Sequence, residues 1–199
     1  MPVMNLPDKI LQSLGRASTD DGAALVPRFV LRPKHWVLMI ILVGLPILLD
    51  QMSKNWALSH LVRGLARKWG PLMLTLVHNS GAMGGMLSSW PPLLRTVSIS
   101  AWALVLVFFY FVFQFLIATR APTLRCGLSL YLGAILSNAY DRVSRGVVVD
   151  FVTFPALGLS HWVFNVSDFV QWLAIGMILW ALFREWLRRR GNLRRLRDS

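Results

Sequence analysis

The stretch WVLMIILVGLPILLDQMSKN, residues 36–55, decides the fold class of this chain. It carries no charged side chain before Asp50, and a helix needs about 20 mostly apolar residues to cross a bilayer. A cleavable signal peptide is a poor description, because the run starts far from the N-terminus, is long and lacks a small-x-small cleavage site. The stretch therefore predicts a membrane-spanning helix that ends in a polar cluster.

Three further apolar runs follow, at about residues 93–118, 124–142 and 166–187. Of the 199 residues, 55% are hydrophobic and only 15% are charged, whereas soluble domains carry about 25% charged residues. The sequence thus predicts an integral membrane protein of the all-α class with four transmembrane helices.

Basic residues gather before Trp36 and after Phe183. Such flanks are typical of the cytoplasmic side of a membrane protein, and four spans return the chain to that side. We expect a cytoplasmic N-terminal extension at 1–35, a four-helix membrane domain at 36–187 and a basic cytoplasmic tail at 188–199. The formal net charge of +12 could indicate nucleic acid, but no aromatic-interleaved binding motif accompanies it, so no nucleic-acid partner is expected.

The two segments between spans that fall on the extracytoplasmic side, 56–92 and 143–165, contain strand signals. Pro71 and the Leu-Thr-Leu-Val run after it indicate short strands with a glycine turn. The β-branched run in RGVVVDFVTF, residues 145–154, is also typical of a strand. We expect a small β element on that side.

Carboxylates are almost absent from the membrane domain. Between Trp36 and Phe183 the only acids are Asp50, Asp141, Asp150 and Asp168. A carboxylate at membrane depth costs roughly 2.5–3.5 kcal/mol, so each of the four is a candidate functional residue. The alternation of spans places all four near the same, outer surface.

Two of these acids are predicted to act as a pair. Two carboxylates in a partly dry site cannot both ionise easily, so they share a proton. One can then activate water while the other polarises a carbonyl group. Asp150 and Asp168 have no basic residue within one helical turn, which leaves their protons free to move. The alternatives are that Asp150 is a solvated loop acid and that Asp168 is a first-turn acid on the helix dipole.

The other two acids are interpreted as structural. Asp50 and Lys54 are i,i+4 neighbours, and Asp141 is followed by Arg142, so we expect an ion pair in each case. The alternative for both pairs is contact with substrate or lipid head groups. The motifs Asn138-Ala-Tyr-Asp141 and Asn165-Val-Ser-Asp168 repeat one spacing, and i,i+3 residues share a helix face.

Five blocks stand in an order that resembles the lipoprotein signal peptidases, also called signal peptidase II. The blocks are DQMSK (50–54), HNSGA (78–82), SNAYDR (137–142), VVDFV (148–152) and FNVSD (164–168). The resemblance covers residues 36–185.

That resemblance implies a four-helix membrane aspartyl peptidase with an extracytoplasmic β cradle, in the bacterial cytoplasmic membrane. Such enzymes remove the signal peptide of diacylglyceryl-modified prolipoproteins just before the lipidated cysteine. The implied catalytic residues are Asp150 and Asp168. The implied supporting residues are Asp50, Lys54, Asn79, Gly81, Asn138, Asp141, Arg142 and Asn165. Lipid-modified prolipoproteins and membrane lipids are the expected partners, with no metal or cofactor and a monomeric chain.

Three departures from the family pattern affect the expected groove. Met83-Gly84-Gly85 stands where an aromatic residue is usual, Ser137 where glycine is common, and Ser167 where alanine is usual. A diverged paralogue that cleaves another membrane substrate, or only binds lipoproteins, is the alternative function.

Other classes fit less well. A metal hydrolase would need clustered ligands, and the four histidines are scattered without an HExxH pattern. Ser80 lacks the surroundings of a nucleophile elbow, and the lone Cys126 is interpreted as a buried thiol. A proton-relay transporter would need acids across the membrane rather than on one side.

Overall fold

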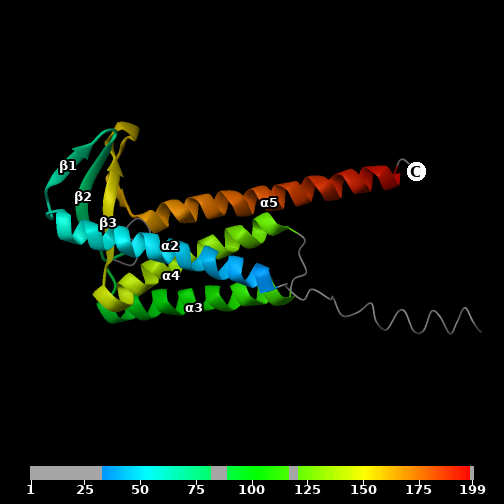
Figure 1. Ribbon diagram of the computed structural model, residues 1–199, viewed down its shortest axis with the longest axis horizontal. Coiled ribbons are helices and arrows are strands. Elements are labelled where there is room, and N and C mark those ends of the chain that lie inside the picture. The colour runs from blue at the N-terminus through cyan, green and yellow to red at the C-terminus, as the bar shows by residue number, and fades with distance from the viewer. Residues whose placement is uncertain (1–32, 82–88, 117–120, 198–199) are drawn as a thin grey trace, which may run out of the picture. The chain divides into compact units, whose positions relative to one another are not determined.

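The computed structural model describes residues 33–81, 89–116 and 121–197 (Figure 1). Residues 1–32 lie outside these ranges. The Met83–Gly85 departure therefore lies wholly outside the described residues. Of the predicted N-terminal extension, 1–35, only residues 33–35 are described. The described part consists of helices α2 (Pro33–His60), α3 (Pro92–Leu116), α4 (Pro122–Arg145) and α5 (Val166–Arg197) with a small sheet.

Three of the described helices are long and apolar enough to cross a membrane: α2, α3 and α5. Helix α4 has 24 residues, which is about 36 Å at 1.5 Å per residue, but its composition is more polar. The reason is its central place, because α4 packs against α2, α3 and α5 and turns its polar side chains toward them. The predicted membrane fold of helices with a small β element is confirmed, and the crossing by α4 stays a prediction.

The sheet lies at the end of the helices where α2 ends and α5 begins (Figure 1). Its four antiparallel strands follow chain order: β1 (Ala66–Trp69), β2 (Leu72–Asn79), β3 (Val148–Phe154) and β4 (Leu159–Phe164). Gly70, with φ of 59°, makes the turn between β1 and β2 possible. Strands were predicted at the Leu-Thr-Leu-Val run and within residues 145–154, where β2 and β3 lie. Strands β1 and β4 were missed, although LSHWVF of β4 is rich in strand-forming residues.

A small apolar core fixes the sheet to the helices. Leu74 and Leu76 of β2 and Phe151 of β3 pack on Ala57 and Leu61, at and just after the last turn of α2. This packing fixes the position of β3 relative to the polar residues of α2.

Helices α2 and α4 approach each other closely at Gly133. A Cβ atom added there would lie 2.3 Å from the backbone oxygen of Val43. Small residues at such crossings let membrane helices come together. The contact brings the C-terminal halves of both helices close enough for their polar side chains to meet.

We expect Gly133→Ala to destabilise the protein by about 1–3 kcal/mol, because the added methyl group meets backbone that cannot move aside. Gly176→Ala is the matched control, since a Cβ atom there meets nothing within 4 Å. Thermal unfolding in detergent measures both, and a Gly133→Ala protein that melts at or above the wild-type temperature would contradict the close-packing argument.

Candidate active site

The polar residues expected from the sequence come together at the sheet end of the bundle. Asp50 and Lys54 lie near the end of α2, and Asn138, Asp141 and Arg142 lie near the end of α4. Asn79 and Gly81 lie at and just after the end of β2, Asp150 in β3, and Asn165 and Asp168 at the start of α5. Segments more than 100 residues apart in the chain thus contribute to one site.

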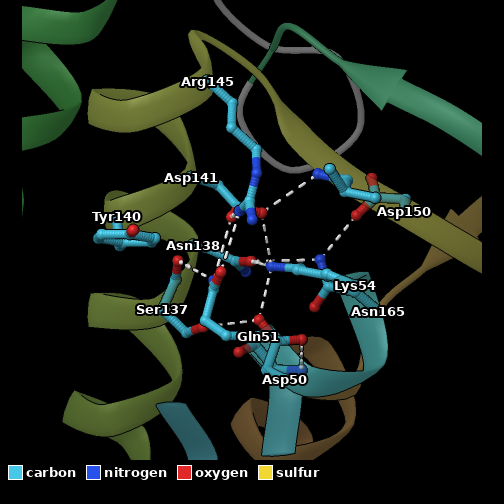
Figure 2. A network of polar contacts seen from close by, with 12 residues as sticks. Asp50, Gln51, Lys54, Ser137, Asn138, Tyr140, Asp141, Arg145, Asp150 and Asn165 are labelled. Carbon is cyan, nitrogen blue, oxygen red and sulfur yellow. Dashed lines mark hydrogen bonds and ion pairs between the residues drawn. The ribbon is translucent and has the colours of Figure 1, made fainter. Parts of the chain in front are cut away.

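Lys54 is the centre of the buried network (Figure 2). Its Nζ atom lies 2.5 Å from Asp50 Oδ2 and 2.9 Å from Asp141 Oδ2, and all three side chains are fully buried. The same ammonium group donates a 2.7 Å hydrogen bond to Asn138 Oδ1. The predicted Asp50–Lys54 ion pair is confirmed, and all three donors of the ammonium group have an acceptor.

The remaining oxygen lone pairs of the two structural acids are also engaged. Asp50 accepts a 2.7 Å hydrogen bond from the hydroxyl of Ser137 and a 2.9 Å bond from the backbone N–H of Ser167. Asp141 accepts hydrogen bonds from the Gln51 amide at 3.0 Å and the Val149 backbone N–H at 3.2 Å. A buried charge is tolerated when it is paired and hydrogen-bonded in this way, so the structural interpretation of these two acids agrees with their contacts.

The predicted ion pair between Asp141 and Arg142 is wrong. Asp141 pairs instead with Arg145, one helical turn further on, because adjacent residues on a helix point about 100° apart while i,i+4 residues share a face. Arg142 donates hydrogen bonds to the backbone oxygens of Gly81 at 2.7 Å and Asn138 at 3.2 Å. It therefore links the end of β2 to α4.

Four network residues were missed by the sequence reasoning: Gln51, Ser137, Arg145 and Ser167. Ser137 and Ser167 had been noted only as departures from a family pattern, yet both contact Asp50. Arg145 could have been found from its i,i+4 spacing to Asp141, whereas nothing in the sequence distinguishes the Gln51 side chain, which donates to Asp141 and Ser137.

Asp150 is buried in β3, with 3% of its surface exposed, so the interpretation as a solvated loop acid is wrong. Its two oxygens accept hydrogen bonds from Asn165 Nδ2 at 2.6 Å and Asn79 Nδ2 at 2.9 Å. Burial, with a smaller contribution from the negative charge of Asp168, raises the pKa of Asp150 to about 7. This carboxyl group is thus poised between its protonated and ionised forms near neutral pH.

Asp168 lies in the first turn of α5, the position that the alternative interpretation gave it. Its Oδ2 atom accepts the backbone N–H of Asn165 at 3.0 Å, while its own N–H donates to Asn165 Oδ1 at 3.1 Å. This reciprocal pair is a capping box at the start of α5, so Asn165 precedes the helix rather than sharing a helical face with Asp168. The other oxygen of Asp168 accepts a 3.3 Å hydrogen bond from Asn138.

Asn165 holds the two candidate catalytic acids in one frame. Its side-chain amide donates to Asp150 and to Asn138, and its backbone and carbonyl oxygen bind Asp168. Asn79, which binds the other oxygen of Asp150, is itself oriented by the Gly81 N–H at 3.0 Å. Each carboxylate therefore has a fixed orientation before any substrate arrives.

A cavity of about 620 Å³ opens beside these acids. Asp150 and Asp168 line it together with Asn79, Asn138 and Arg142. Away from this polar end the wall is mostly apolar and comes from α3, α4, β4 and α5, including Ile99, Ala103, Tyr131, Ile135, Phe164, Trp172 and Ile175. Within the described ranges no three His, Cys, Asp or Glu side chains are grouped so that they could hold a metal ion.

The chain has clear relatives. A family model described as signal peptidase (SPase) II matches residues 41–184. The lipoprotein signal peptidase of Caulobacter vibrioides is 33% identical over 170 residues, which is 79% of this chain and 91% of the relative. That of Clostridium acetobutylicum is 31% identical over 72% of this chain and 91% of the relative.

Two solved structures described as bacterial membrane enzymes share the fold, with TM-scores of 0.66 and 0.63. They are 23% and 24% identical and cover 74% and 72% of this chain, and 88% and 91% of their own. With the family match over most of the membrane domain and the relatives above 30% identity, this chain belongs to the signal peptidase II family.

Proposed function

We propose that this protein is a membrane aspartic endopeptidase that removes the signal peptide from diacylglyceryl-modified prolipoproteins just before the lipidated cysteine. The observation that carries the proposal is that Asp150 and Asp168 line the same cavity, whose wall is mostly apolar away from them. Family membership supports the activity and the lipoprotein substrate.

The charges of the buried network favour a dyad that holds one proton. Asp50 and Asp141 are balanced by Lys54 and Arg145, with which they form ion pairs. The positive charge of Arg142, which lines the cavity, then balances a single negative charge on Asp150 and Asp168 together. With a singly protonated pair these seven side chains carry no net charge together, which a dry environment favours.

The chemistry follows from this state. The ionised carboxylate takes a proton from water, whose oxygen attacks the scissile carbonyl carbon, while the protonated carboxyl group donates to the carbonyl oxygen. Asp150 is the more deeply buried of the two acids, which favours the proton on it, whereas Asp168 stands at the N-terminus of α5, where the helix dipole favours negative charge. Collapse of the tetrahedral intermediate returns a proton to the amine of the new N-terminal cysteine.

The cavity suits a substrate that lies partly in the membrane. Its apolar walls can take acyl chains and the apolar part of a signal peptide, and its polar end holds the peptide bond. We expect the site to face the extracytoplasmic surface of the bacterial cytoplasmic membrane, with both ends of the chain in the cytoplasm, because the basic residues flank the opposite ends of the spans.

Asp150→Asn and Asp168→Asn should each lower the cleavage rate by about 100- to 10,000-fold, the usual contribution of a positioned acid or base. A gel-shift assay with a diacylated prolipoprotein in detergent measures the loss. Glu185→Gln is the matched acid-to-amide control, because Glu185 pairs with Arg188 and Arg189 away from the cavity.

Full cleavage by either dyad variant would rule out the aspartic mechanism. Failure of the folded wild-type protein on several diacylated prolipoproteins would instead favour the paralogue with another substrate.

The reaction rate should follow a bell-shaped pH profile. Below its pKa of about 7, Asp150 keeps the proton that the carbonyl oxygen needs, and above it that proton is lost, so kcat/KM should decline above about pH 7. In acid the rate should fall because the second carboxylate is also protonated. Initial rates from pH 4 to 9, with thermal unfolding at each pH, test this, and a flat rate up to pH 9 would contradict it.

Replacing a structural acid should lower the free energy of unfolding more than replacing an acid of the catalytic pair. Asp141→Asn leaves Lys54 and Arg145 without a shared partner, which we expect to cost about 3–5 kcal/mol. Asp150 ionises near pH 4 when unfolded but near 7 when folded, so its ionisation opposes folding at pH 8.

Asp150→Asn should therefore cost no more than about 1 kcal/mol at pH 8, the loss of one hydrogen bond. Thermal unfolding of both variants at pH 8 measures the difference, and equal losses would refute the division of roles.

A further inference from the structure

The cavity wall contains one side-chain amide outside the acid network, that of Gln171 on α5. Gln171 follows Asp168 by three residues, so the two share a face of the helix. One such step is about 4.5 Å along the axis, and it leads from the start of α5 away from the sheet. Gln171 therefore stands deeper in the bundle than the acids.

Beyond Asp168, the cavity lining on the deeper side of this amide is mostly apolar. Trp172 and Ile175 neighbour it on α5, and Ile99 and Ile135 line the same cavity from α3 and α4. Among the described residues, no hydrogen bond joins the Gln171 side chain to another protein group. A primary amide in an apolar setting costs free energy unless it finds a hydrogen-bonding partner. A ligand that fills the cavity should therefore bind more tightly if it places a hydrogen-bond acceptor at this depth.

We propose that Gln171 is a specificity-determining residue that donates a hydrogen bond to an ester carbonyl of the substrate's diacylglyceryl group. This inference rests on the proposed function. The glyceryl group is joined to the cysteine sulfur, a few covalent bonds from the scissile peptide bond. Its two ester carbonyls are the polar groups that enter the apolar part of the cavity with the acyl chains, so they arrive beyond the acids on the side where Gln171 lies.

The test compares two synthetic prolipoprotein peptides that differ only in the lipid. One carries the diacylglyceryl group, and the other carries a dialkyl glyceryl ether of equal chain length, which lacks both carbonyl oxygens. Wild-type protein should show a KM about tenfold lower for the ester, the effect of one hydrogen bond in a dry site. Its kcat should be the same for both peptides, because the acids are untouched.

Gln171→Leu removes the donor and keeps the volume. It should raise KM for the ester by about tenfold, leave kcat unchanged and abolish the preference for ester over ether. Leu173→Met, at an exposed position of the same helix, is the control and should keep the preference. Gln171→Met is a second variant without the amide donor, to be used if Gln171→Leu does not fold. The comparison of ester and ether peptides with wild-type protein tests the inference without any variant.

The outcomes separate this inference from the function on which it rests. Equal KM values for ester and ether with wild-type protein would overturn the role of Gln171 while leaving the peptidase intact. A rise in KM that is equal for both lipids in Gln171→Leu would also overturn it, since the amide would then contact the peptide. No cleavage of the ester peptide by wild-type protein would refute the proposed function, and the Gln171 inference with it.

Discussion

The three bonds of the Lys54 ammonium group are the constraint on which the rest of the site depends. They join α2 to α4 through Asp141 and Asn138, and Asn138 in turn contacts Asn165 and Asp168 at the start of α5. A fully buried ammonium group must keep all its acceptors. The positions of three helices are thereby tied to one nitrogen atom. The positions of the candidate catalytic acids depend on this arrangement.

Tight packing and polar bonding depend on each other in this arrangement. The approach of α2 and α4 at Gly133 brings Asp50 and Lys54 within reach of Ser137, Asn138 and Asp141. On the opposite side, the bond from the Val149 N–H to Asp141 fixes the strand that carries Asp150. The sheet is therefore part of the active-site framework, since one acid of the dyad comes from a strand and the other from a helix.

Much of this could be predicted from the sequence, because apolar length and charge spacing are local signals. The long, mostly apolar runs predicted the helices, and the alternation of spans predicted that the four acids lie on one side. Two features of the site could not be predicted from neighbouring residues in the sequence. Whether Asp150 is buried depends on Asn79 and Asn165, which are 71 and 15 residues away. The partner of Asp141 depends on side-chain direction around the helix, which reading the chain residue by residue overlooked.

The i,i+4 pairs have a consequence for how the chain enters the membrane. Asp50 and Lys54 both belong to α2, and Asp141 and Arg145 both belong to α4. Each of these two acids thus has a counter-ion on its own helix, so neither has to enter the membrane as an unpaired carboxylate. Assembly then adds the Lys54–Asp141 contact as the two helices meet. Insertion into the membrane and the framework that holds the candidate active site thus depend on the same four side chains.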